Sequence, residues 1–504
     1  MRRLLTAAAF CLLAGSAAAQ GTPSGTLHIA LREDADMLDP TLARTYVGRI
    51  VFAGLCDKLF DIDQKLAIVP QLAAGYEWSD PKTLVVHLRP NVQFQDGEAM
   101  DATAVKYSID RHMTMQGSFR RPEISTLDHV EIVDPLTVRL VLKSPSSPFL
   151  SQLTDRAGMI VAPKAAETAG KDFALHPVCA GPFKFVERVP QDRIVLERFP
   201  EYWDAENIHF DRVIYQPMAD TSVRLANLQA GSVDLVEQIV PSDVAAVKRD
   251  SRLKLAISNA LGYYGITNNV GNGARAETPF GRDKRVRQAF ELAIDRTALV
   301  QVVYNGMFLP TRQAVPPDSP FYVPQDQPPP RDVARAKALL QQAGATLPVA
   351  VDLLTPNSPD VRQAAEVIQS MAAEAGFDVH INTMEFASSL DTAQNGNFQA
   401  YLLAWSGRAD ADGNLYSFLY TGQAQNYSHY SDKTVDALLD QSRAVADVGQ
   451  RRDLYAKMDA QADQDLPIIY LWTPKNIVGM TAKLQGFRPV PDGMIRLQGL
   501  AMAK

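Results

Sequence analysis

The chain has 504 residues and a formal net charge of −7, from 50 lysines and arginines against 57 aspartates and glutamates. This length exceeds what one hydrophobic core normally supports, so the sequence predicts at least two lobes. A mildly acidic chain without runs of lysine or arginine argues against nucleic acid or an anionic membrane as the main partner, which leaves a small ligand or another protein.

The first 19 residues have the pattern of a secretory signal peptide. Two arginines precede an apolar run, and three alanines before Gln20 form a small-residue cleavage site. The run is shorter than the roughly 20 residues that span a bilayer, and Phe10 precedes Cys11 where a lipoprotein signal needs a small residue. We therefore expect cleavage, export, and a net charge of about −9 once both arginines are lost.

The first half of the chain is predicted to be rich in strands with mixed pairing. Turn residues stand between neighbouring apolar runs at Asp134-Pro135 and at 190–192, so two of the strand pairs should be hairpins. Alternating or continuous apolar patterns predict the strands at 27–31, 130–133, 138–142, 183–189 and 193–199.

The stretch 78–111 combines a strand, a turn and a helix. Period-two alternation over 83–89 puts three apolar side chains on one face of a strand. Asp96-Gly97 supplies a residue that tolerates a positive φ and ends the extended run. Asp101 is placed to cap the helix that follows, in which apolar residues recur at helical spacing.

After about residue 260 the pattern becomes that of an α/β lobe. Asp283 is expected to cap a helix with one apolar stripe, and Gly306 stands where a helix would stop. A further helix is expected over 331–343. A strand, a helix and a strand at 349–355, 360–375 and 377–384 predict a βαβ unit with a right-handed crossover.

The end of the chain is predicted to return to the first lobe. Residues 436–465 have helical periodicity, and the apolar run 466–472 is interpreted as the returning strand. Two crossings between lobes make a hinge. We expect lobe I to comprise 20–262 and 474–504, including an extra strand-rich subdomain, and lobe II to comprise 263–473.

Two cysteines remain after the predicted cleavage, Cys56 and Cys179. In an oxidising compartment they are expected to form a disulfide, and the alternative is a pair of buried apolar thiols. The closed loop exceeds 100 residues, for which the chain-entropy model gives about 4 to 5 kcal/mol as an upper bound.

Motifs for catalysis and for metal binding are missing from the sequence. It contains no HExxH, GxSxG or Walker A pattern. A GxGxxA match at 271–276 is followed by Pro279 rather than by a helix, so we interpret it as a surface loop. The eight histidines lack ligand spacing. We expect no catalytic residue, no cofactor and no protein-built metal site, while a metal carried by a small chelator stays possible.

The 78–111 string resembles the block that marks family 5 extracytoplasmic solute-binding proteins, the peptide, nickel and glutathione receptors of ABC importers. That block has Trp and Asp, a strand ending in Leu-Arg, a Phe followed by Asp-Gly, and a helix with Tyr-Ser and Arg, and all of these are present. Similar strings occur at 179–183, 201–235, 286–296 and 336–344. The resemblance implies an α/β, two-lobed periplasmic binding protein of type II with mixed sheets and an extra subdomain in the first lobe.

Residues 405–414, WSGRADADGN, are the candidate ligand segment because they follow an apolar strand, where α/β lobes carry their ligand loops. Family members that bind free peptides have an Asp three residues after this Trp, and it pairs with the ligand's α-ammonium. Here that position is Arg408, which would repel an ammonium and favour a carboxylate. We expect Arg408 to contact the solute, and the alternative is a surface salt bridge.

Six further residues are considered for the ligand site. Asp410 and its neighbour Asp412 supply a negative partner for an amine or hold Arg408, although a solvated turn is an alternative for both. Trp405 suits the wall for an amphipathic ligand, or it is a core residue. By resemblance Thr45 and Tyr46 lie in a loop that faces the cleft, and Tyr264 lies at the first lobe crossing, where a core position is equally consistent.

The resemblance implies a monomer that closes its two lobes around a small solute and presents it to the permease and ATPase of an ABC importer. Because of Arg408, the expected solute is a peptide-like or amino-acid-derived compound with a carboxylate, glutathione-like ligands included. A sensor or chaperone-like binder on the same scaffold is an alternative. An exported hydrolase is another, although no nucleophile-and-base signature supports it.

Overall fold

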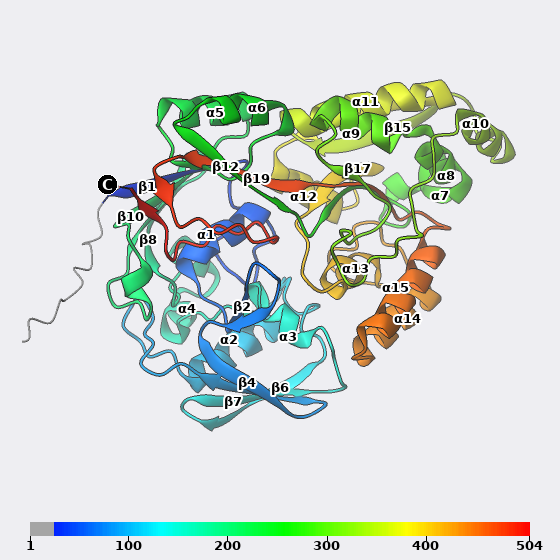
Figure 1. Ribbon diagram of the computed structural model, residues 1–504. Coiled ribbons are helices and arrows are strands. Elements are labelled where there is room, and N and C mark those ends of the chain that lie inside the picture. The colour runs from blue at the N-terminus through cyan, green and yellow to red at the C-terminus, as the bar shows by residue number, and fades with distance from the viewer. Residues whose placement is uncertain (1–24, 504) are drawn as a thin grey trace, which may run out of the picture.

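The computed structural model describes residues 25–503, so the predicted signal peptide lies outside the described residues. The described chain forms a seven-stranded sheet, a six-stranded sheet and a separate four-stranded sheet, with helices packed around them (Figure 1). Parallel and antiparallel pairs occur in both large sheets. The expected α/β fold with mixed sheets is confirmed. No helix of the described part is long and apolar enough to cross a membrane.

The seven-stranded sheet is the centre of the first lobe. Strand β1 pairs in parallel with β10 on one side and with β11 on the other, so the carboxyl ends of these three strands meet at one edge. Helix α1 (Tyr46–Leu55) follows β1 along the chain. In sheet order the strands are β12 (Leu253–Asn259), β19 (Lys475–Thr481), β11 (Leu235–Val236), β1 (Thr26–Leu31), β10 (Arg212–Pro217), β9 (Arg193–Arg198) and β8 (Phe183–Val189).

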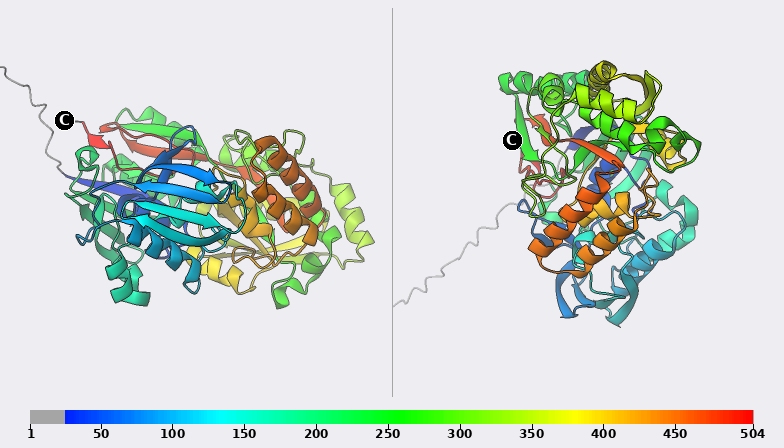
Figure 2. Two further views of the ribbon diagram at one scale, coloured as in Figure 1. Left: turned by 90° about the horizontal axis from the view of Figure 1, so that it is seen from below. Right: turned by 90° about the vertical axis from the view of Figure 1, so that its right-hand side faces the viewer.

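The four-stranded sheet forms the extra subdomain and lies at the lower end of the molecule (Figures 1 and 2). Its order is β4 (Ala73–Asp80), β5 (Thr83–Leu88), β7 (Thr137–Leu142) and β6 (Leu127–Asp134). Helix α2 (Ala102–Thr114) packs on it, and the Asp101 side chain accepts hydrogen bonds from the amides of Thr103 and Ala104. The strand, the cap and the β6–β7 hairpin agree with the sequence prediction.

Short elements complete the first lobe. They are β2 (Phe60–Ile62), β3 (Ile68–Pro70), β20 (Leu484–Gln485), β21 (Ala501–Met502), α3 (Phe149–Gln152), α4 (Pro163–Ala169), α5 (Thr221–Ala230) and α6 (Val244–Arg249).

The six-stranded sheet is the centre of the second lobe. The predicted βαβ unit is present, because β15 and β16 are parallel and α11 (Pro359–Ala375) connects them. In sheet order the strands are β14 (Leu309–Pro310), β18 (Ile468–Thr473), β13 (Tyr263–Asn268), β17 (Ala400–Trp405), β15 (Val349–Pro356) and β16 (Phe377–Met384). The other helices of this lobe are α7 (Pro279–Arg282), α8 (Lys284–Ala293), α9 (Arg296–Tyr304), α10 (Val333–Gln342), α12 (Phe386–Gln394), α13 (Asp412–Leu419), α14 (Lys433–Ala444) and α15 (Val448–Ala462).

Two helical predictions in the second lobe need correction. The helix expected to run from Asp283 towards Gly306 is two helices, because Asp295 leaves helical geometry and caps α9 through the amide of Ala298. The helical stretch 436–465 is likewise divided, and Asp447 caps its second helix. Both breaks lie where an aspartate side chain offers the backbone an alternative to continuing the helix.

The chain passes between the two large sheets twice. Strand β12 leads into β13 through residues 260–262, and β18 leads into β19 through Pro474. The run 466–472, interpreted as the strand of the return, thus lies mainly in β18 of the second lobe's sheet, and β19 is the strand in the first. Because β12 pairs with β19 and β13 pairs with β18, the two connections lie side by side, as a hinge requires (Figure 1).

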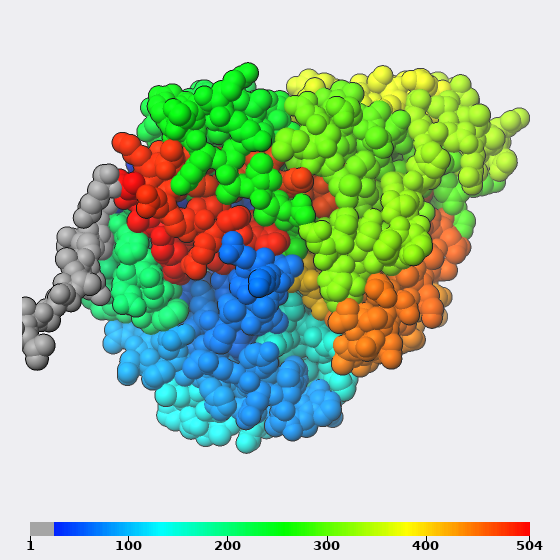
Figure 3. Space-filling model, viewed as in Figure 1, coloured from blue at the N-terminus to red at the C-terminus, as the bar shows by residue number. Residues whose placement is uncertain are grey.

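The lobes are closed against each other in this structure (Figure 3). Arg44 of the first lobe pairs with Asp391 of the second at 2.6 Å. Gln152 donates a hydrogen bond to Asp412 at 3.0 Å, and the Ser147 hydroxyl donates to the Val445 carbonyl at 2.6 Å. Side chains and backbone of both lobes therefore meet across the gap between them.

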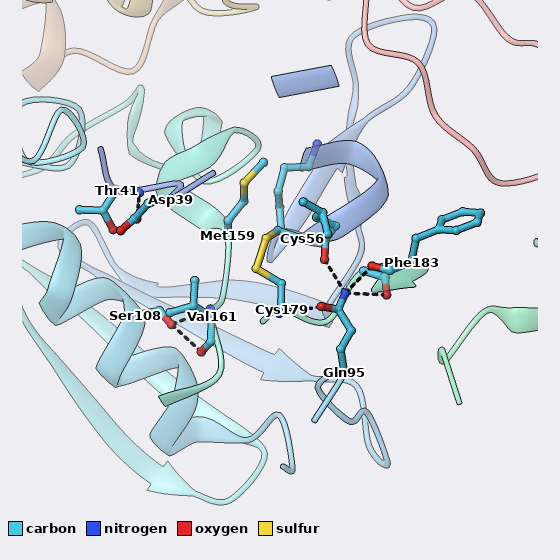
Figure 4. The surroundings of a disulfide bond; sticks show 12 residues. Asp39, Thr41, Cys56, Gln95, Ser108, Met159, Val161, Cys179 and Phe183 are labelled. Carbon is cyan, nitrogen blue, oxygen red and sulfur yellow. Dashed lines mark hydrogen bonds between the residues drawn. A yellow bond between two sulfur atoms is a disulfide. The ribbon is translucent and has the colours of Figure 1, made fainter. Parts of the chain in front are cut away.

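The structure joins Cys56 and Cys179 by a disulfide, as the expected compartment indicated (Figure 4). Both sulfurs are buried, and Cys56 ends helix α1. The Gln95 side chain reinforces the junction, because its amide donates at 2.8 Å to both the Leu55 and the Phe183 carbonyls. The bridge thus fixes the carboxyl end of α1 against the start of β8.

Candidate ligand-binding site

The parallel strands of both sheets point their carboxyl ends at the gap between the lobes. In the first lobe Arg32 and Glu33 directly follow β1, and Glu237 directly follows β11. In the second lobe Trp405 ends β17, and Ser406 follows it. Loops at such strand ends carry polar groups over a rigid base, which is where α/β lobes place their ligands.

A cavity lies between these strand ends and has two adjoining compartments. Counted out to open solvent, the space inside the Arg44 compartment is about 610 Å³ and that inside the Glu33 compartment about 720 Å³. Both compartments are narrow in this closed form, so only part of that space is enclosed by the protein. The two compartments share one wall, formed by Tyr46, Phe386, Ala404, Trp405 and Ser406.

Three of the predicted site residues line the cavity, Tyr46 and Trp405 in the shared wall and Tyr264 in the Glu33 compartment alone. Tyr46, the first residue of α1, donates its hydroxyl to the Gly493 carbonyl at 2.9 Å. Trp405 donates its indole N–H to Asn414 at 2.9 Å. Tyr264 lines the Glu33 compartment. These rings line the cavity and suit the carbon skeleton of an amphipathic ligand.

Tyr264 is both a core residue and a cavity residue, so the two alternatives for it do not exclude each other. Its ring stacks on Trp472, with centroids 4.9 Å apart and an angle of 16° between the planes. Trp472 is completely buried. The stack holds Tyr264 rigidly at the base of the cavity.

Charged side chains of both signs border the cavity. Arg32 is neutralised by Glu237, with 2.7 Å between its Nε and Oε1, and its guanidinium lies 4.9 Å from the Tyr46 ring centre. Arg44 borders the other compartment, and its partner Asp391 is 67% exposed. Glu33 has neither a salt bridge nor a hydrogen bond to its carboxylate among residues 25–503. The compartments therefore differ in charge, with a cation at one end and an unpaired carboxylate at the other.

Arg408 lies behind the cavity wall and does not line either compartment. It is 9% exposed, and its Nε is 2.5 Å from Oδ2 of Asp155 in the first lobe. Its guanidinium also lies over the Trp405 ring, 4.5 Å from the centre. In this closed form Arg408 thus has a carboxylate partner from the protein, and that partner belongs to the opposite lobe.

Asp155 is the centre of a buried cluster with more arginines than carboxylates. Arg49 donates from Nε to Oδ1 of Asp155 at 3.1 Å and from Nη1 to the Ser406 hydroxyl at 3.1 Å. Arg156 and Arg120 also belong to the cluster, and Arg120 pairs with Glu123 at 2.9 Å. Four arginines against two carboxylates leave a positive excess directly behind Ser406, which lines the cavity.

The excess of arginines in this cluster changes the pKa values of Arg408 and Asp155. Burial and the neighbouring Arg49 lower the pKa of Arg408 to about 9, against the opposing effect of Asp155. Burial acts to raise the pKa of Asp155, but Arg408 and Arg49 outweigh it and hold that pKa well below its usual value. Asp155 therefore stays ionised, while the arginines lack enough negative charge around them.

Thr45 and Asp410 line neither compartment in this structure. Thr45 is buried and caps α1, because its hydroxyl oxygen accepts from the Gly48 amide at 3.2 Å. Asp410 forms two hydrogen bonds with Arg451, at 2.6 and 2.8 Å. Asp412 is likewise paired with Arg443 at 2.6 Å. Partners within the protein thus account for these polar groups.

Sequence reasoning missed Glu33, Arg44 and Phe386. A signal for Glu33 was present, because it follows the predicted strand 27–31 just as the 405–414 loop follows its strand. Phe386 follows β16 and its predicted strand in the same way. The only signal for Arg44 in the sequence is that it lies two residues before Tyr46, which was predicted to face the cleft. Within the described residues no cluster of three or more His, Cys, Asp or Glu side chains could hold a metal ion.

Comparison with known protein families gives a match over most of the chain. The model of the bacterial extracellular solute-binding proteins, family 5, matches residues 67–426. Among curated relatives, the glutathione-binding protein GsiB of Pectobacterium atrosepticum is 29% identical over 483 residues, which cover 93% of either chain. GsiB of Salmonella typhimurium is 29% identical over 499 residues, 96% of either chain.

Solved structures of similar shape belong to periplasmic binding proteins. DppA from Helicobacter pylori, in complex with the peptide STSA, superimposes with a TM-score of 0.87 at 24% identity, covering 96% of this chain and 99% of its own. AgaA from A.tumefacien R10, in complex with agropinic acid, has a TM-score of 0.86 at 26% identity, covering 95% and 99%.

Proposed function

Because the chain belongs to the bacterial extracellular solute-binding proteins of family 5, we propose that it captures a small peptide-like or amino-acid-derived solute with a carboxylate between its two lobes. It then presents the closed complex to the permease and ATPase of an ABC importer. The protein acts in the periplasm as a monomer after removal of residues 1–19. It binds its solute and releases it unchanged.

The observation that carries this proposal is the cavity between the lobes. Its compartments share an aromatic wall, with Arg44 in one and the Glu33 carboxylate in the other. Such a site matches a solute with an apolar middle and polar ends. This solute class agrees with the names of the similar proteins, which are described as binding glutathione, a peptide and agropinic acid.

The carboxylate of the solute is assigned to the Arg44 compartment. Arg44 has two protein partners, the mostly exposed Asp391 at 2.6 Å and the nearly buried Asp36, whose Oδ2 lies 3.8 Å from the Arg44 Nε. Water screens the pair with Asp391 and leaves that side of the guanidinium available to a ligand. The arginine excess behind Ser406 makes this end of the cavity positive as well. Closure removes water from the site, and a carboxylate that meets an arginine there gains from the lower dielectric.

In this proposal Arg408 does not contact the solute but supports the cavity wall. It holds the Trp405 ring in place and joins the two lobes through Asp155. The departure from Asp at this position still bears on specificity, since a buried arginine next to the cavity disfavours an ammonium there. A micromolar dissociation constant corresponds to about −8 kcal/mol, which one charge-assisted contact and a well-packed aromatic wall can supply.

The test begins with the ligand that the protein retains. The mature chain, residues 20–504, is purified and denatured, and any released compound is identified by mass spectrometry. The refolded protein is then titrated by calorimetry with that compound, with glutathione and with dipeptides, each also as its carboxamide. Saturation at 100 times the dissociation constant should add about 2.7 kcal/mol of stability, and the solute should be recovered unchanged after incubation.

The Arg44→Gln variant is expected to bind the carboxylate form about 10 to 100 times more weakly and the carboxamide form unchanged. Arg452→Gln on α15, an exposed arginine away from the cavity, is the matched control. Equal losses for carboxylate and carboxamide would contradict the assignment of the carboxylate to Arg44. Consumption of the solute would contradict a purely binding role.

A further inference from the structure

Glu33 is a carboxylate that the structure leaves without a protein partner. It lies two residues beyond β1, at the carboxyl end of a strand that is parallel to both of its neighbours. Its side chain borders the Glu33 compartment, together with Tyr264, Ser358 and Phe386. The adjacent Arg32 does not neutralise it, because both Nε and Nη2 of Arg32 donate to Glu237.

The groups around Glu33 add to the negative charge at this end of the cavity. Its own loop contributes Arg32 and Asp36, β11 contributes Glu237, and the loop after β16 contributes Glu385. Of these, only Arg32 is positive. Tyr46 and Tyr264 are the other titratable groups of the compartment, and burial raises the pKa of both. An uncompensated carboxylate in a low-dielectric cavity is costly unless a ligand supplies the opposite charge.

The other acidic candidates near the cavity already have partners. Asp155 pairs with Arg408 and Arg49, and Asp410 pairs with Arg451. Asp412 pairs with Arg443. Among the described residues that line the two compartments, Glu33 is therefore the only unpaired carboxylate that a cationic nitrogen could meet.

On the basis of the function proposed above, we infer that Glu33 binds a cationic amine of the solute, such as the α-ammonium of an amino-acid-derived compound. The solute then lies across the shared aromatic wall, with its amine in the Glu33 compartment and its carboxylate in the Arg44 compartment. Glu33 thereby selects for zwitterionic solutes over acids of the same shape that lack the amine.

Binding of an amine at Glu33 is coupled to the release of a proton from its carboxyl group. Burial raises the pKa of the Glu33 carboxyl to about 8, with Arg32 opposing and the neighbouring carboxylates adding to the rise. In the closed lobes without a solute the carboxyl is therefore mainly protonated at pH 7. An ammonium stabilises the carboxylate and displaces this proton, so binding of the amine forms should release protons and strengthen as the pH rises from 6 towards 8.

The test uses matched amine pairs on the mature chain. Glutathione, the dipeptide Met-Leu and any solute released from the purified protein are titrated by calorimetry, each beside its N-acetyl form. Wild type, Glu33→Gln and the exposed control Glu201→Gln are compared in phosphate and in Tris, whose ionisation heats differ, so that the number of released protons is measured. Thermal unfolding shows whether each variant is folded.

We expect Glu33→Gln to bind the amine forms about 10 to 100 times more weakly at pH 8, to release no proton, and to lose the pH dependence. N-acetyl forms should bind weakly and equally to both proteins. If the variant binds amines as tightly as wild type, or still releases the proton, the inference is wrong. If Glu33 had a purely structural role, the variant would bind the amine and N-acetyl forms more weakly to the same extent. A loss of affinity confined to the amine forms would contradict that role.

The same panel separates this inference from the proposed function. Binding of N-acetylated acids as tightly as their amines would overturn the role of Glu33 and leave a carboxylate-binding transport receptor. If no amino-acid-derived compound binds to wild type, the proposed solute class and the inference both fail. If the Glu33→Gln variant does not fold, Glu33→Asp takes its place, because it retains the charge on a shorter side chain. Glu33→Asp should still release the proton but bind the amine forms more weakly than wild type.

Discussion

Neighbouring side chains in the 405–414 loop serve different purposes because the loop lies between the cavity and the opposite lobe. Trp405 and Ser406 face the cavity. Arg408, two residues further, reaches Asp155 of the first lobe. A charged residue in a ligand loop therefore need not touch the ligand, since a carboxylate of the protein can satisfy it first.

Replacing Arg408 with alanine is predicted to weaken every solute by about tenfold or more, and carboxylates slightly more, because the positive cluster behind Ser406 loses one charge. The physical reason is that the variant removes the contact between the lobes and leaves the bound solute untouched. Calorimetry with the carboxylate and carboxamide forms of one solute measures the two losses. A loss confined to the carboxylate form would instead support direct contact between Arg408 and the solute.

Asp155→Asn is the companion of that experiment. It removes the charge on the other side of the same pair and should reproduce the loss seen with Arg408→Ala. Because the two residues act through one contact, the double variant should lose much less than the two single losses added together. Additive losses would mean that the residues act separately.

At the scale of elements, the sequence predicted the regular pieces well where the periodicity and the cap agree. Strand β5 and helix α2 have the predicted faces, and Asp101 caps the helix as expected. The helix after Asp283 was predicted as one piece because the apolar stripe continues into the next helix. Its break depends on Asp295, whose side chain bonds to the backbone and starts α9 in a new direction.

The disulfide fixes the helix that carries Tyr46 and Arg49, so its removal is predicted to lower stability. Cys56 and Cys179 are separated by 123 positions, and the chain-entropy model gives up to about 4 to 5 kcal/mol for such a loop. Urea unfolding of wild type and of the Cys56→Ala, Cys179→Ala double variant measures the difference. Reductant should shift wild type towards the variant and leave the variant unchanged; identical unfolding midpoints would contradict the prediction.

Gly262 is predicted to be essential to the hinge connection. A Cβ at this position would lie 1.7 Å from the Trp405 carbonyl oxygen, and backbone cannot move aside as a flexible side chain does. Gly262→Ala should push β13 from β17, cost about 1 to 3 kcal/mol of stability, and displace Trp405 from the cavity wall. Thermal unfolding and calorimetry measure the two effects.

Gly75→Ala in β4 is the matched control, because nothing lies within 4 Å of the added Cβ and the residue is not in the left-handed region. It should retain both stability and affinity. If Gly262→Ala behaves like this control, the close approach of the two backbones does not matter for binding.

At the scale of the whole molecule, the closed arrangement depends on a few contacts between the lobes. The Arg408 to Asp155 pair is buried, whereas Asp391 of the Arg44 pair is mostly exposed. Exposed ion pairs contribute little and are screened by salt, while breaking a buried pair leaves an uncompensated charge. The buried cluster should therefore govern closure more than the surface pair.

Small-angle X-ray scattering is predicted to detect this difference. Added solute should reduce the radius of gyration of the mature wild-type chain, because the hinge closes around the ligand. Arg408→Ala should need more solute for the same reduction, and Asp391→Asn should resemble wild type at 150 mM salt. A radius of gyration that does not respond to saturating solute would contradict closure by a hinge.

The sequence by itself determined the α/β scaffold, the signal of the family, the disulfide pair and three aromatic residues of the cavity wall. The scaffold follows from local periodicity and capping, which depend on residues close together in the chain. The disulfide was expected from the oxidising compartment, and Tyr46 and Tyr264 were expected from the family resemblance. Only the tertiary structure decided that Arg408 meets Asp155, that Asp410 meets Arg451, and that Glu33 meets no protein cation. Partners of charged groups depend on which lobes and loops fold against each other, and this packing brings together residues that no local pattern connects.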